Sequence, residues 1–433
     1  MKITCIAGSG MGGTEKAAYL YACGLAQKGH TVEALTDPDG CRSDMLIRSG
    51  VTIRKVDHTI DGLADYFSEF RPDVVHNHTS GYSDQSTLYA ALAKMSEHKP
   101  KLVETNVFGK LLDFHDHGDV DARLFITFTS GMQAYQRTRV IPIGPSRDRD
   151  NVVFYPLPDD AFAMDREDGK SLRKSLCVAD NDVLVIRLGR PGSKWEAWEC
   201  IAFQKARKCN SRLKLLLMEP KSSLTEDIKA GKYGEGIIIK QADSDPEVLR
   251  QVYSAGDIMF QASSFGESFG YTLAEGMAAG MPVITLSTPW GDQAQNELIE
   301  HGKTGYVCRS LKAMSEALLE LSLDPEKSTR FGAAGKDRIR KITSLVTETS
   351  ILEEIYGHLV MKNETPLADR RFKEWLAFIS ERSTKDIACY DKDCGMKTAL
   401  YTASAYDAFR WGKHLIKYIM MRAGGKRVYP LKW

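Results

Sequence analysis

Residues 263–282 read Ser-Ser-Phe-Gly-Glu-Ser-Phe-Gly-Tyr-Thr-Leu-Ala-Glu-Gly-Met-Ala-Ala-Gly-Met-Pro. This stretch joins a polar glycine loop to the start of a helix. Gly266 and Gly270 allow the backbone to approach a ligand closely. The free N–H groups of a helix that begins near Phe269 favour an anion, because the positive end of the helix dipole lies behind them. The stretch therefore predicts a site for a phosphorylated ligand.

Two glutamates flank the start of this predicted helix. Glu275 falls in the second turn, too far along to cap the helix, where its carboxylate can accept from the two hydroxyls of a ribose. Glu267 precedes the helix and can bond a neighbouring sugar. The alternative interpretation is a pair of solvated glutamates beside a helix that packs through its apolar residues.

The run Glu267-Ser-Phe-Gly-Tyr-Thr-Leu-Ala-Glu275, followed by Ala-Ala-Gly-Met-Pro-Val-Ile, resembles the E-x7-E signature of family-4-type retaining glycosyltransferases with the GT-B fold. The resemblance extends loosely over residues 1–355 and is strongest over 255–307. It implies that Glu267 contacts the donor sugar and Glu275 the ribose. The donor-binding loop it implies also includes Ser268, Phe269 and Gly270.

The same resemblance implies an α/β fold of two doubly wound, Rossmann-like domains that face a cleft. The implied activity moves a sugar from a nucleotide diphosphate donor, a UDP- or GDP-sugar, to a hydroxyl acceptor. The stereochemistry would be retained and no divalent metal would be needed. A catalytically inactive GT-B-like subunit that binds a glycan or a partner is an alternative.

Length and composition agree with a two-domain globular protein. The 433 residues exceed what one core usually supports, and 43% of them are hydrophobic and 27% charged. The net charge of +1 gives no overall bias toward nucleic acid. Nine cysteines without a repeated spacing indicate reduced thiols in a cytoplasmic protein. We find no signal peptide and no apolar run long enough to span a membrane.

Hydrophobic patterning predicts two series of strands and helices. The first domain, 1–158, has predicted strands at Lys2–Ala7, Gly29–Asp37, Pro72–Val75, Lys101–Thr105 and Leu124–Thr127. The polar stretch Asp159–Lys170 reads as a linker. The second domain, 171–345, has predicted strands at Val183–Leu188, Leu213–Met218, Gly236–Ile239, Ile258–Gln261 and Pro282–Leu286, then helices at Leu311–Leu323 and Glu326–Ile342. A crossover helix follows at 346–360, and a helical extension at 361–433.

The loop Gly8–Gly13 matches G-x-G-x-x-G between a strand and a helix, and Asp37 ends the next strand. This is the pattern of a dinucleotide site, so an NAD(P)-dependent oxidoreductase is a further alternative. The loop also resembles the glycine loop of the glycosyltransferases, which faces the donor phosphates or the acceptor. By that resemblance Gly12 and Gly13 are donor-binding residues.

Arg190 and Lys194 follow the first strand of the second domain, at the edge where open α/β sheets bind ligands. Two fixed cations there can hold a diphosphate and stabilise the charge that builds on the leaving group, in place of a metal. They resemble the Gly-Arg…Lys element of the family, one residue shorter, with Trp195 where a glycine is common. The alternative is a surface Arg-Lys pair.

His76 and His78 follow the predicted strand Pro72–Val75 and match an Asp-Val-Val-His-x-His stretch of the family. The resemblance places His76 and His78 on the acceptor side and makes His78 a candidate catalytic residue, although a histidine at a strand end is often structural. Many relatives carry another histidine where this chain has Asn106, which can donate a hydrogen bond but cannot take a proton. Asn106 is a third acceptor-side candidate.

Metal-binding patterns do not stand out. Asp-x-Asp occurs six times in unrelated contexts, the first at Asp37/Asp39, which looks like chance. Cys389 and Cys394 lack the second pair or the histidines that a zinc site needs. We therefore predict no metal site.

An amphipathic helix is predicted at 408–421, with an apolar face that includes Trp411 and Leu415 and a polar face that is entirely basic. Seven Lys or Arg and no acidic residue follow Asp407. This pattern is typical of a helix on an anionic membrane surface, and the alternative is a final helix packed on the protein itself. Membrane binding would suit a lipid-linked saccharide or another envelope glycan precursor as acceptor, in polysaccharide biosynthesis at the cytoplasmic face. No nucleic-acid-binding module accompanies the basic patch.

Overall fold

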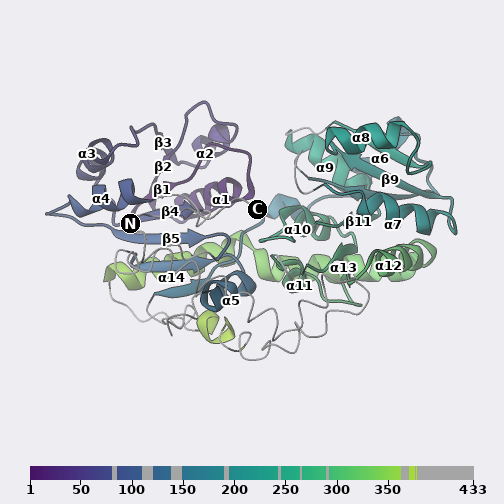
Figure 1. Cartoon of the computed structure of the whole chain (residues 1–433). Coiled ribbons are helices and arrows are strands. Elements are labelled where there is room, and N and C mark those ends of the chain that lie inside the picture. The colour runs from purple at the N-terminus through teal and green to yellow at the C-terminus, as the bar shows by residue number, and fades with distance from the viewer. Residues whose placement is uncertain are drawn as a thin grey trace, which may run out of the picture. The chain divides into compact units, whose positions relative to one another are not determined.

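The computed structural model describes residues 1–79, 85–109, 120–137, 149–189, 195–241, 245–263, 266–288, 292–361, 370–375 and 377. The chain forms two compact units. Unit 1 contains Met1–Val153 and the chain from Ile351 onward, and unit 2 contains Phe154–Ser350. Each unit is built on one parallel sheet with helices on both sides (Figure 1).

Unit 1 has a sheet of order β3-β2-β1-β4-β5-β6-β7, all of whose described pairings are parallel. Its strands and helices are β1 (Lys2–Ile6), α1 (Gly13–Gln27), β2 (Thr31–Leu35), α2 (Ser43–Arg48), β3 (Thr52–Arg54), α3 (Ile60–Phe70), β4 (Val74–Thr79), α4 (Ser86–Ala93), β5 (Lys101–Asn106), β6 (Ala122–Phe125), α5 (Phe128–Arg137) and β7 (Asp150–Val152).

Neighbouring residues of β1 show that this sheet is covered on both faces. Thr4 bonds Tyr66 of α3 at 2.9 Å between hydroxyl oxygens. Cys5, which points to the other face, donates to the Ala18 carbonyl of α1 at 3.6 Å. An apolar cluster that includes Phe67 and Leu92 fills the space between the sheet and α3 and α4. The unit is therefore doubly wound.

Unit 2 has a parallel sheet of order β10-β9-β8-β11-β12-β13. Its elements are the 3₁₀ helix η2 (Asp159–Phe162), α6 (Arg166–Ser175), β8 (Val183–Arg187), α7 (Trp198–Arg207), β9 (Leu213–Met218), α8 (Ser222–Lys229), β10 (Ile237–Lys240), α9 (Pro246–Ala255), β11 (Ile258–Gln261), α10 (Tyr271–Ala278), β12 (Val283–Leu286), α11 (Gln295–Leu298), β13 (Gly305–Cys308), α12 (Leu311–Leu323) and α13 (Pro325–Thr343). Helix α14 (Leu345–Met361) begins in unit 2 and ends in unit 1.

The two faces of this second sheet are also both covered. Phe260 belongs to the apolar cluster that includes Phe203 of α7 and Leu318 of α12. Met259 points to the opposite face, where a Cβ added to Gly276 of α10 would lie 3.1 Å from its Cγ. Glycine at position 276 therefore allows α10 to approach the sheet closely. Two doubly wound, Rossmann-like units confirm the predicted α/β class.

Most predicted strands are present, with differences at their ends. Strand β4 continues to Thr79 because it pairs with β5 as far as Thr79↔Asn106, so His76 and His78 lie within the strand and not after it. The short edge strands β3 and β7 were not predicted, since three residues give little alternation to detect. Helix α10 starts at Tyr271, two residues later than predicted, because Gly270 adopts a left-handed conformation.

The predicted linker Asp159–Lys170 is wrong in part, because η2 and the first half of α6 lie within it. Helix α6 starts with a capping box of Asp165 and Asp168 and is too polar to show an apolar stripe. It is held instead by close backbone packing: a Cβ added to Gly169 would lie 2.3 Å from the Ala255 nitrogen. Tertiary contact thus stabilises a helix that its composition does not reveal.

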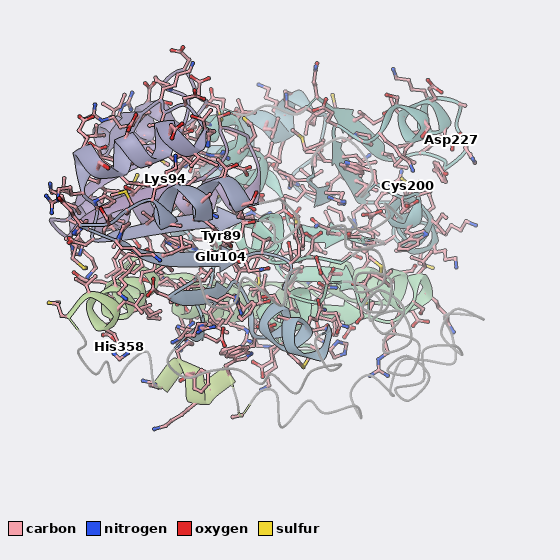
Figure 2. The ribbon with its side chains drawn as sticks, turned by 60° about the vertical axis from the view of Figure 1, so that its left-hand side comes forward. Tyr89, Lys94, Glu104, Cys200, Asp227 and His358 are labelled. Atoms are coloured by element: carbon pink, nitrogen blue, oxygen red, sulfur yellow. The ribbon has the colours of Figure 1, made fainter. Side chains whose placement is uncertain are left out.

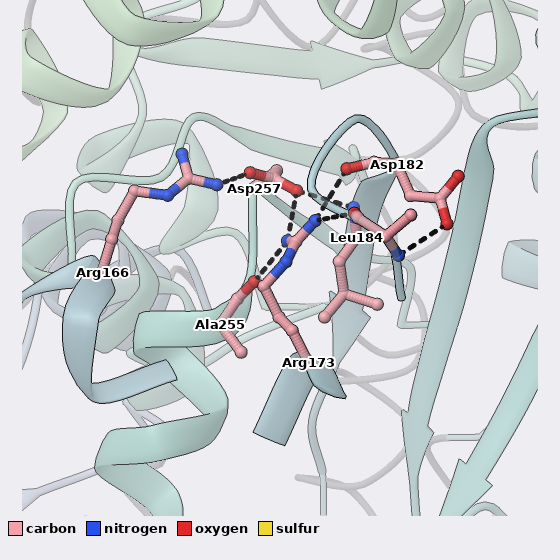
Figure 3. A network of polar contacts seen from close by, with 7 residues as sticks. Arg166, Arg173, Asp182, Leu184, Ala255 and Asp257 are labelled. Carbon is pink, nitrogen blue, oxygen red and sulfur yellow. Dashed lines mark hydrogen bonds and ion pairs between the residues drawn. The ribbon is translucent and has the colours of Figure 1, made fainter. Parts of the chain in front are cut away.

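An ion-pair network joins α6 to the sheet (Figure 3). Asp257, just before β11, accepts from the Leu184 N–H of β8 at 2.7 Å and from Arg173 Nη1 at 2.9 Å, and pairs with Arg166. Arg173 also donates to the Ala255 carbonyl at 2.9 Å. One carboxylate therefore links α6, the end of α9 and two strands at the edge where those strands begin.

Residues 370–375 form a helical turn that packs on unit 1. The Trp375 side chain is fully buried, and its Nε1 donates to the Phe128 carbonyl at 3.2 Å. A Cβ added to Gly131 of α5 would lie 2.4 Å from Trp375 Cζ2. Gly131 therefore makes room for the indole. The predicted helix 408–421 lies outside the described residues.

No helix within the described ranges combines the length and the apolar character needed to cross a bilayer. The cysteines of those ranges are free thiols, in agreement with the prediction of reduced cysteines. Cys389 and Cys394 lie outside the described residues.

Substitution of Asp257 tests the network that holds α6. We expect Asp257→Asn to lower the free energy of unfolding by about 1–3 kcal/mol, because the Arg173 guanidinium, whose side chain is only 11% exposed, loses its charged acceptor. Urea unfolding followed by circular dichroism measures the change. The matched control is Asp227→Asn, on the surface of α8 (Figure 2), whose pair with Lys232 is solvent-exposed and should leave the midpoint unchanged. Equal effects of the two variants would contradict this account.

Candidate functional site

The loop that follows β11 depends on two glycines. Gly266 has a φ of 71°, and a Cβ added to it would lie 1.7 Å from the Asp292 carbonyl oxygen. Gly270 has a φ of 89° and precedes the first residue of α10. Both positions require glycine, by left-handed conformation and, at Gly266, by the close approach of the loop after β12. The sequence predicted glycines for contact with a ligand, and the structure adds this contact between two loops.

Glu267 lies nearly buried between these loops. Its Oε1 accepts from Gln261 Nε2 at 2.7 Å, and Gln261 Oε1 in turn accepts from the Thr272 hydroxyl at 2.8 Å. The Glu267 backbone is held on both sides, since its carbonyl accepts from the Ala294 N–H at 2.9 Å and its N–H donates to Gln295 Oε1 at 3.2 Å. The carboxylate is therefore fixed before any ligand arrives.

Gln295, in α11, was not predicted as a site residue. Besides accepting from Glu267, its Nε2 donates to Thr288 Oγ1 at 2.9 Å and to the Leu286 carbonyl at 3.3 Å. It therefore joins the loops that follow β11 and β12. Gln261 was missed as well, although a polar residue that ends an otherwise apolar strand, Ile258–Gln261, was a signal.

Glu275 lies in the second turn of α10, as predicted. Its Oε2 accepts from the Tyr253 hydroxyl of α9 at 2.5 Å. Burial raises the pKa of Tyr253 well above its usual range, and the negative charge of Glu275 raises it further. The second glutamate of the signature therefore also has a defined partner.

Arg190 and Lys194 lie outside the described residues. Arg187, before them in the chain, and Glu199, after them, form a buried ion pair. Arg187, at the end of β8, donates through Nε to Glu199 Oε1 of α7 at 2.8 Å, and both side chains are almost fully buried. Glu199 Oε1 also accepts from the Ala262 N–H at 2.9 Å. Burial raises the pKa of the Glu199 carboxyl, and the Arg187 charge opposes that rise. The pair links β8, α7 and the first residue after β11.

Trp195 covers this pair. Its ring, which is fully buried, lies 4.3 Å from the Arg187 guanidinium carbon, a cation–π contact. A Cβ added to Gly189 would lie 2.6 Å from Arg187 Nη1, so the glycine lets the chain turn across the guanidinium. The tryptophan that departs from the family pattern thus has a structural reason in this chain. A charged residue at the end of an apolar strand was the signal that could have revealed Arg187.

In unit 1 a carboxylate of α1 lies against the glycine loop Gly8–Gly13. Glu15, in the first turn of α1, lies against the loop, and a Cβ added to Gly12 would lie 2.2 Å from its Oε2. Arg42 donates to the Gly10 and Met11 carbonyls at 2.8 and 3.2 Å. The negative charge of Glu15, partly offset by the positive charge of Arg42, makes this turn less favourable for a diphosphate. This geometry disfavours the dinucleotide interpretation of Gly8–Gly13.

The two histidines of β4 have different surroundings. His76 Nε2 bonds the Thr105 hydroxyl at 2.7 Å, and its Nδ1 bonds the Tyr356 hydroxyl of α14 at 2.6 Å. Within the part of the chain that the structure describes, neither ring nitrogen of His78 has a hydrogen-bond partner, although the residue is buried. The His78 ring lies 4.0 Å from that of His76 and 6.2 Å from that of Tyr21, between centroids.

Burial lowers the pKa of His78 to about 3 and that of His76 well below its usual value. Both imidazoles are therefore neutral near pH 7. Asn106, at the end of β5, is also buried, and its Nδ2 donates to Glu104 Oε1 at 3.3 Å. Glu104 accepts from the Tyr89 hydroxyl of α4 at 3.1 Å (Figure 2). The carboxyl ends of β4 and β5 thus gather buried polar side chains. His115 and His117 lie outside the described residues.

The neutral histidines predict a loss of stability in acid. Between pH 6.5 and about 3, His78 is protonated in the unfolded chain but neutral in the folded protein. The free energy of unfolding therefore falls as the pH is lowered through this range. At pH 5 the cost is about 2 kcal/mol for one such histidine. We expect His78→Phe to reduce the loss of unfolding free energy between pH 7.5 and pH 5 by about that amount in urea titrations. His58→Gln, an exposed control, should follow wild type. A wild-type pH dependence in the His78 variant would contradict the assignment.

Comparison with known proteins places this geometry in a family context. The family model of the glycosyl transferases group 1 matches residues 202–338. The chain is 38% identical over 74 residues to an alpha-1,3/1,6-mannosyltransferase of Dictyostelium discoideum, a match that spans 17% of this chain and 17% of that relative.

Solved structures match over most of the chain at low identity. A glycosyltransferase from Rickettsia africae superposes with a TM-score of 0.67 at 18% identity, covering 84% of this chain and 99% of that one. The Anabaena protein HepE, solved in complex with UDP and glucose, gives 0.62 at 16% identity, covering 82% and 98%. The chain therefore has the two Rossmann-like units of the GT-B fold, and its second unit matches the group 1 glycosyl transferases over residues 202–338.

Proposed function

We propose that this protein is a glycosyltransferase that moves a sugar from a nucleotide diphosphate donor to a hydroxyl acceptor, with retention and without a divalent metal. The observation that carries the proposal is the pair of held carboxylates at α10: Glu267 fixed by Gln261, and Glu275 fixed by Tyr253. Fixed acceptors on both sides of a helix N-terminus suit a ligand that has an anionic diphosphate between two polyhydroxylated parts. The match of residues 202–338 to the group 1 family supports this assignment.

The proposed roles follow from these positions. Glu267 accepts from hydroxyls of the donor sugar and Glu275 from the ribose, while the loop of Ser268, Phe269 and Gly270 and the N–H groups of α10 face the diphosphate. Arg190 and Lys194, by resemblance, bind the diphosphate as well. When the bond from the sugar to the β-phosphate oxygen breaks, negative charge grows on that oxygen, and fixed cations and N–H groups stabilise it.

Unit 1 would supply the acceptor side. The Glu15 carboxylate beside Gly8, Gly10 and Gly12 is suited to a hydroxyl group, which favours an acceptor over donor phosphates at this loop. His78 is neutral and its nitrogens lack partners, so it can accept from or donate to an acceptor hydroxyl. In a front-face reaction the acceptor oxygen attacks the anomeric carbon, and its proton passes to the departing β-phosphate. His76 and Asn106, near the carboxyl ends of β4 and β5, are the other residues of this acceptor side.

Donor turnover tests the proposal. Purified protein in EDTA is supplied with UDP-, GDP- and ADP-sugars, and nucleoside diphosphate release is measured. We expect release from one of these donors and a loss of about 100-fold or more in Glu267→Ala, because a fixed polar contact at the reacting sugar is removed. Glu226→Ala, an exposed glutamate of α8, should retain wild-type turnover.

Other outcomes would redirect the assignment. Donor binding without release from any sugar nucleotide, with or without acceptor glycans, would contradict turnover and favour the inactive subunit. Tight binding of NAD(P) without binding of any sugar nucleotide would overturn the family assignment itself.

We further propose that the basic segment 408–421, which the sequence predicts to be an amphipathic helix, binds an anionic membrane and that the acceptor is a lipid-linked saccharide. The charge pattern supports this, since seven Lys or Arg and no acidic residue follow Asp407. We expect Lys413→Glu with Lys417→Glu to weaken binding to phosphatidylserine vesicles by about tenfold or more, because each basic residue contributes about 1 kcal/mol at such a surface. Co-sedimentation measures it, with phosphatidylcholine vesicles as the control. Equal binding of wild type and variant would contradict the proposal.

A further inference from the structure

The hydrogen bond between Tyr253 and Glu275 joins two helices of unit 2. The Tyr253 hydroxyl of α9 lies 2.5 Å from Glu275 Oε2 of α10. The Tyr253 side chain is 3% exposed, whereas Glu275 is only half-buried. The buried, stiff Tyr253 side chain thus holds the more flexible and more accessible Glu275 side chain.

The direction of this bond is fixed. Burial and the nearby carboxylate keep the pKa of Tyr253 well above its usual range, so the phenol remains protonated and donates. Glu275 accepts with one of its two oxygens. A carboxylate offers about four lone-pair directions, so the bond to Tyr253 leaves capacity for hydroxyl donors of a ligand.

Tyr253 is itself held by the backbone around it. Two residues further on, Ala255 ends α9, and its carbonyl accepts from Arg173 Nη1 at 2.9 Å (Figure 3). Gly169 of α6 packs directly against the Ala255 backbone. The Asp257 network therefore contacts the end of α9, two residues beyond Tyr253.

We propose that Tyr253 is a positioning residue that orients Glu275 for the ribose hydroxyls of the donor nucleotide. The inference rests on the proposed function and adds to it a residue that does not itself touch the ligand. A glutamate side chain has three rotatable bonds, and ordering it during binding costs conformational entropy. The bond to Tyr253 orders the Glu275 side chain when the protein folds, so the ribose binds a carboxylate that is already in place.

Binding of nucleoside diphosphates with and without ribose hydroxyls tests the proposal. Isothermal titration calorimetry on the full chain compares UDP, GDP and ADP with their 2′,3′-dideoxy counterparts. The variants are Tyr253→Phe, which removes one oxygen from a buried ring, and Tyr306→Phe, a matched control that loses a Tyr–Glu bond of 3.0 Å at the surface of β13.

We expect wild type to prefer the ribose form of its nucleotide. Tyr253→Phe should bind that ribose form about tenfold more weakly and bind the dideoxy form as wild type does, whereas Tyr306→Phe should match wild type for both. Unchanged dideoxy binding also shows that the variant site is folded. With a sugar donor, KM should rise in Tyr253→Phe while kcat stays constant, because the ribose contact is equal in the ground and transition states.

Three results would overturn the proposal, and each has a different meaning. A Tyr253→Phe variant that discriminates ribose from dideoxyribose as well as wild type does would refute the role of Tyr253 and leave that of Glu275 intact. A wild type that binds both forms equally would refute the ribose contact of Glu275, and the positioning role with it. Weaker binding of both forms in Tyr253→Phe alone would indicate a structural role and also refute the proposal.

Discussion

The buried ion pair of Arg187 and Glu199 is the constraint on which the ligand edge of unit 2 depends. Removing two charges from water is costly, and the attraction between them offsets that cost only when the geometry is good and further hydrogen bonds are made. Here Glu199 Oε1 also accepts from Ala262, and Arg187 lies against Trp195, while Glu199 Oε2 is buried without a hydrogen-bond partner among the described residues. The pair fixes the end of β8, the start of α7 and the first residue after β11 relative to one another.

These three points are the supports of the candidate site. The chain that carries Arg190 and Lys194 leaves β8 immediately after Arg187, and the loop that carries Glu267 begins just beyond Ala262. A hydrophobic pair could fill the same volume, but it would not hold the Ala262 N–H or turn the chain over a guanidinium. The pair therefore contributes geometry at the ligand edge more than stability.

In both units, the buried polar residues that the structure describes at the carboxyl ends of the strands have hydrogen-bond partners, with His78 as an exception. Burial of a polar group is unfavourable without a partner, and Glu267, Glu104 and His76 each have one. His78 differs, since both of its nitrogens are buried without partners. An unpartnered buried polar group is most readily explained where a ligand can supply its hydrogen bond. His78 therefore differs from His76 as a candidate for ligand contact.

The sequence by itself determined the class of fold and marked the candidate site. Alternating apolar strands and helices predicted two doubly wound units, and the glycines and glutamates of 263–282 marked the loop before α10, because turn conformation and helix start are local properties. Only the tertiary structure decided the partners. Tyr253 and Glu275, Arg187 and Glu199, and Gly131 and Trp375 meet because sheet register and helix packing bring them together, and no local pattern encodes those distances. The same reason explains why a polar helix such as α6 reads as a linker: what stabilises it lies on α9 and before β11, far away along the chain.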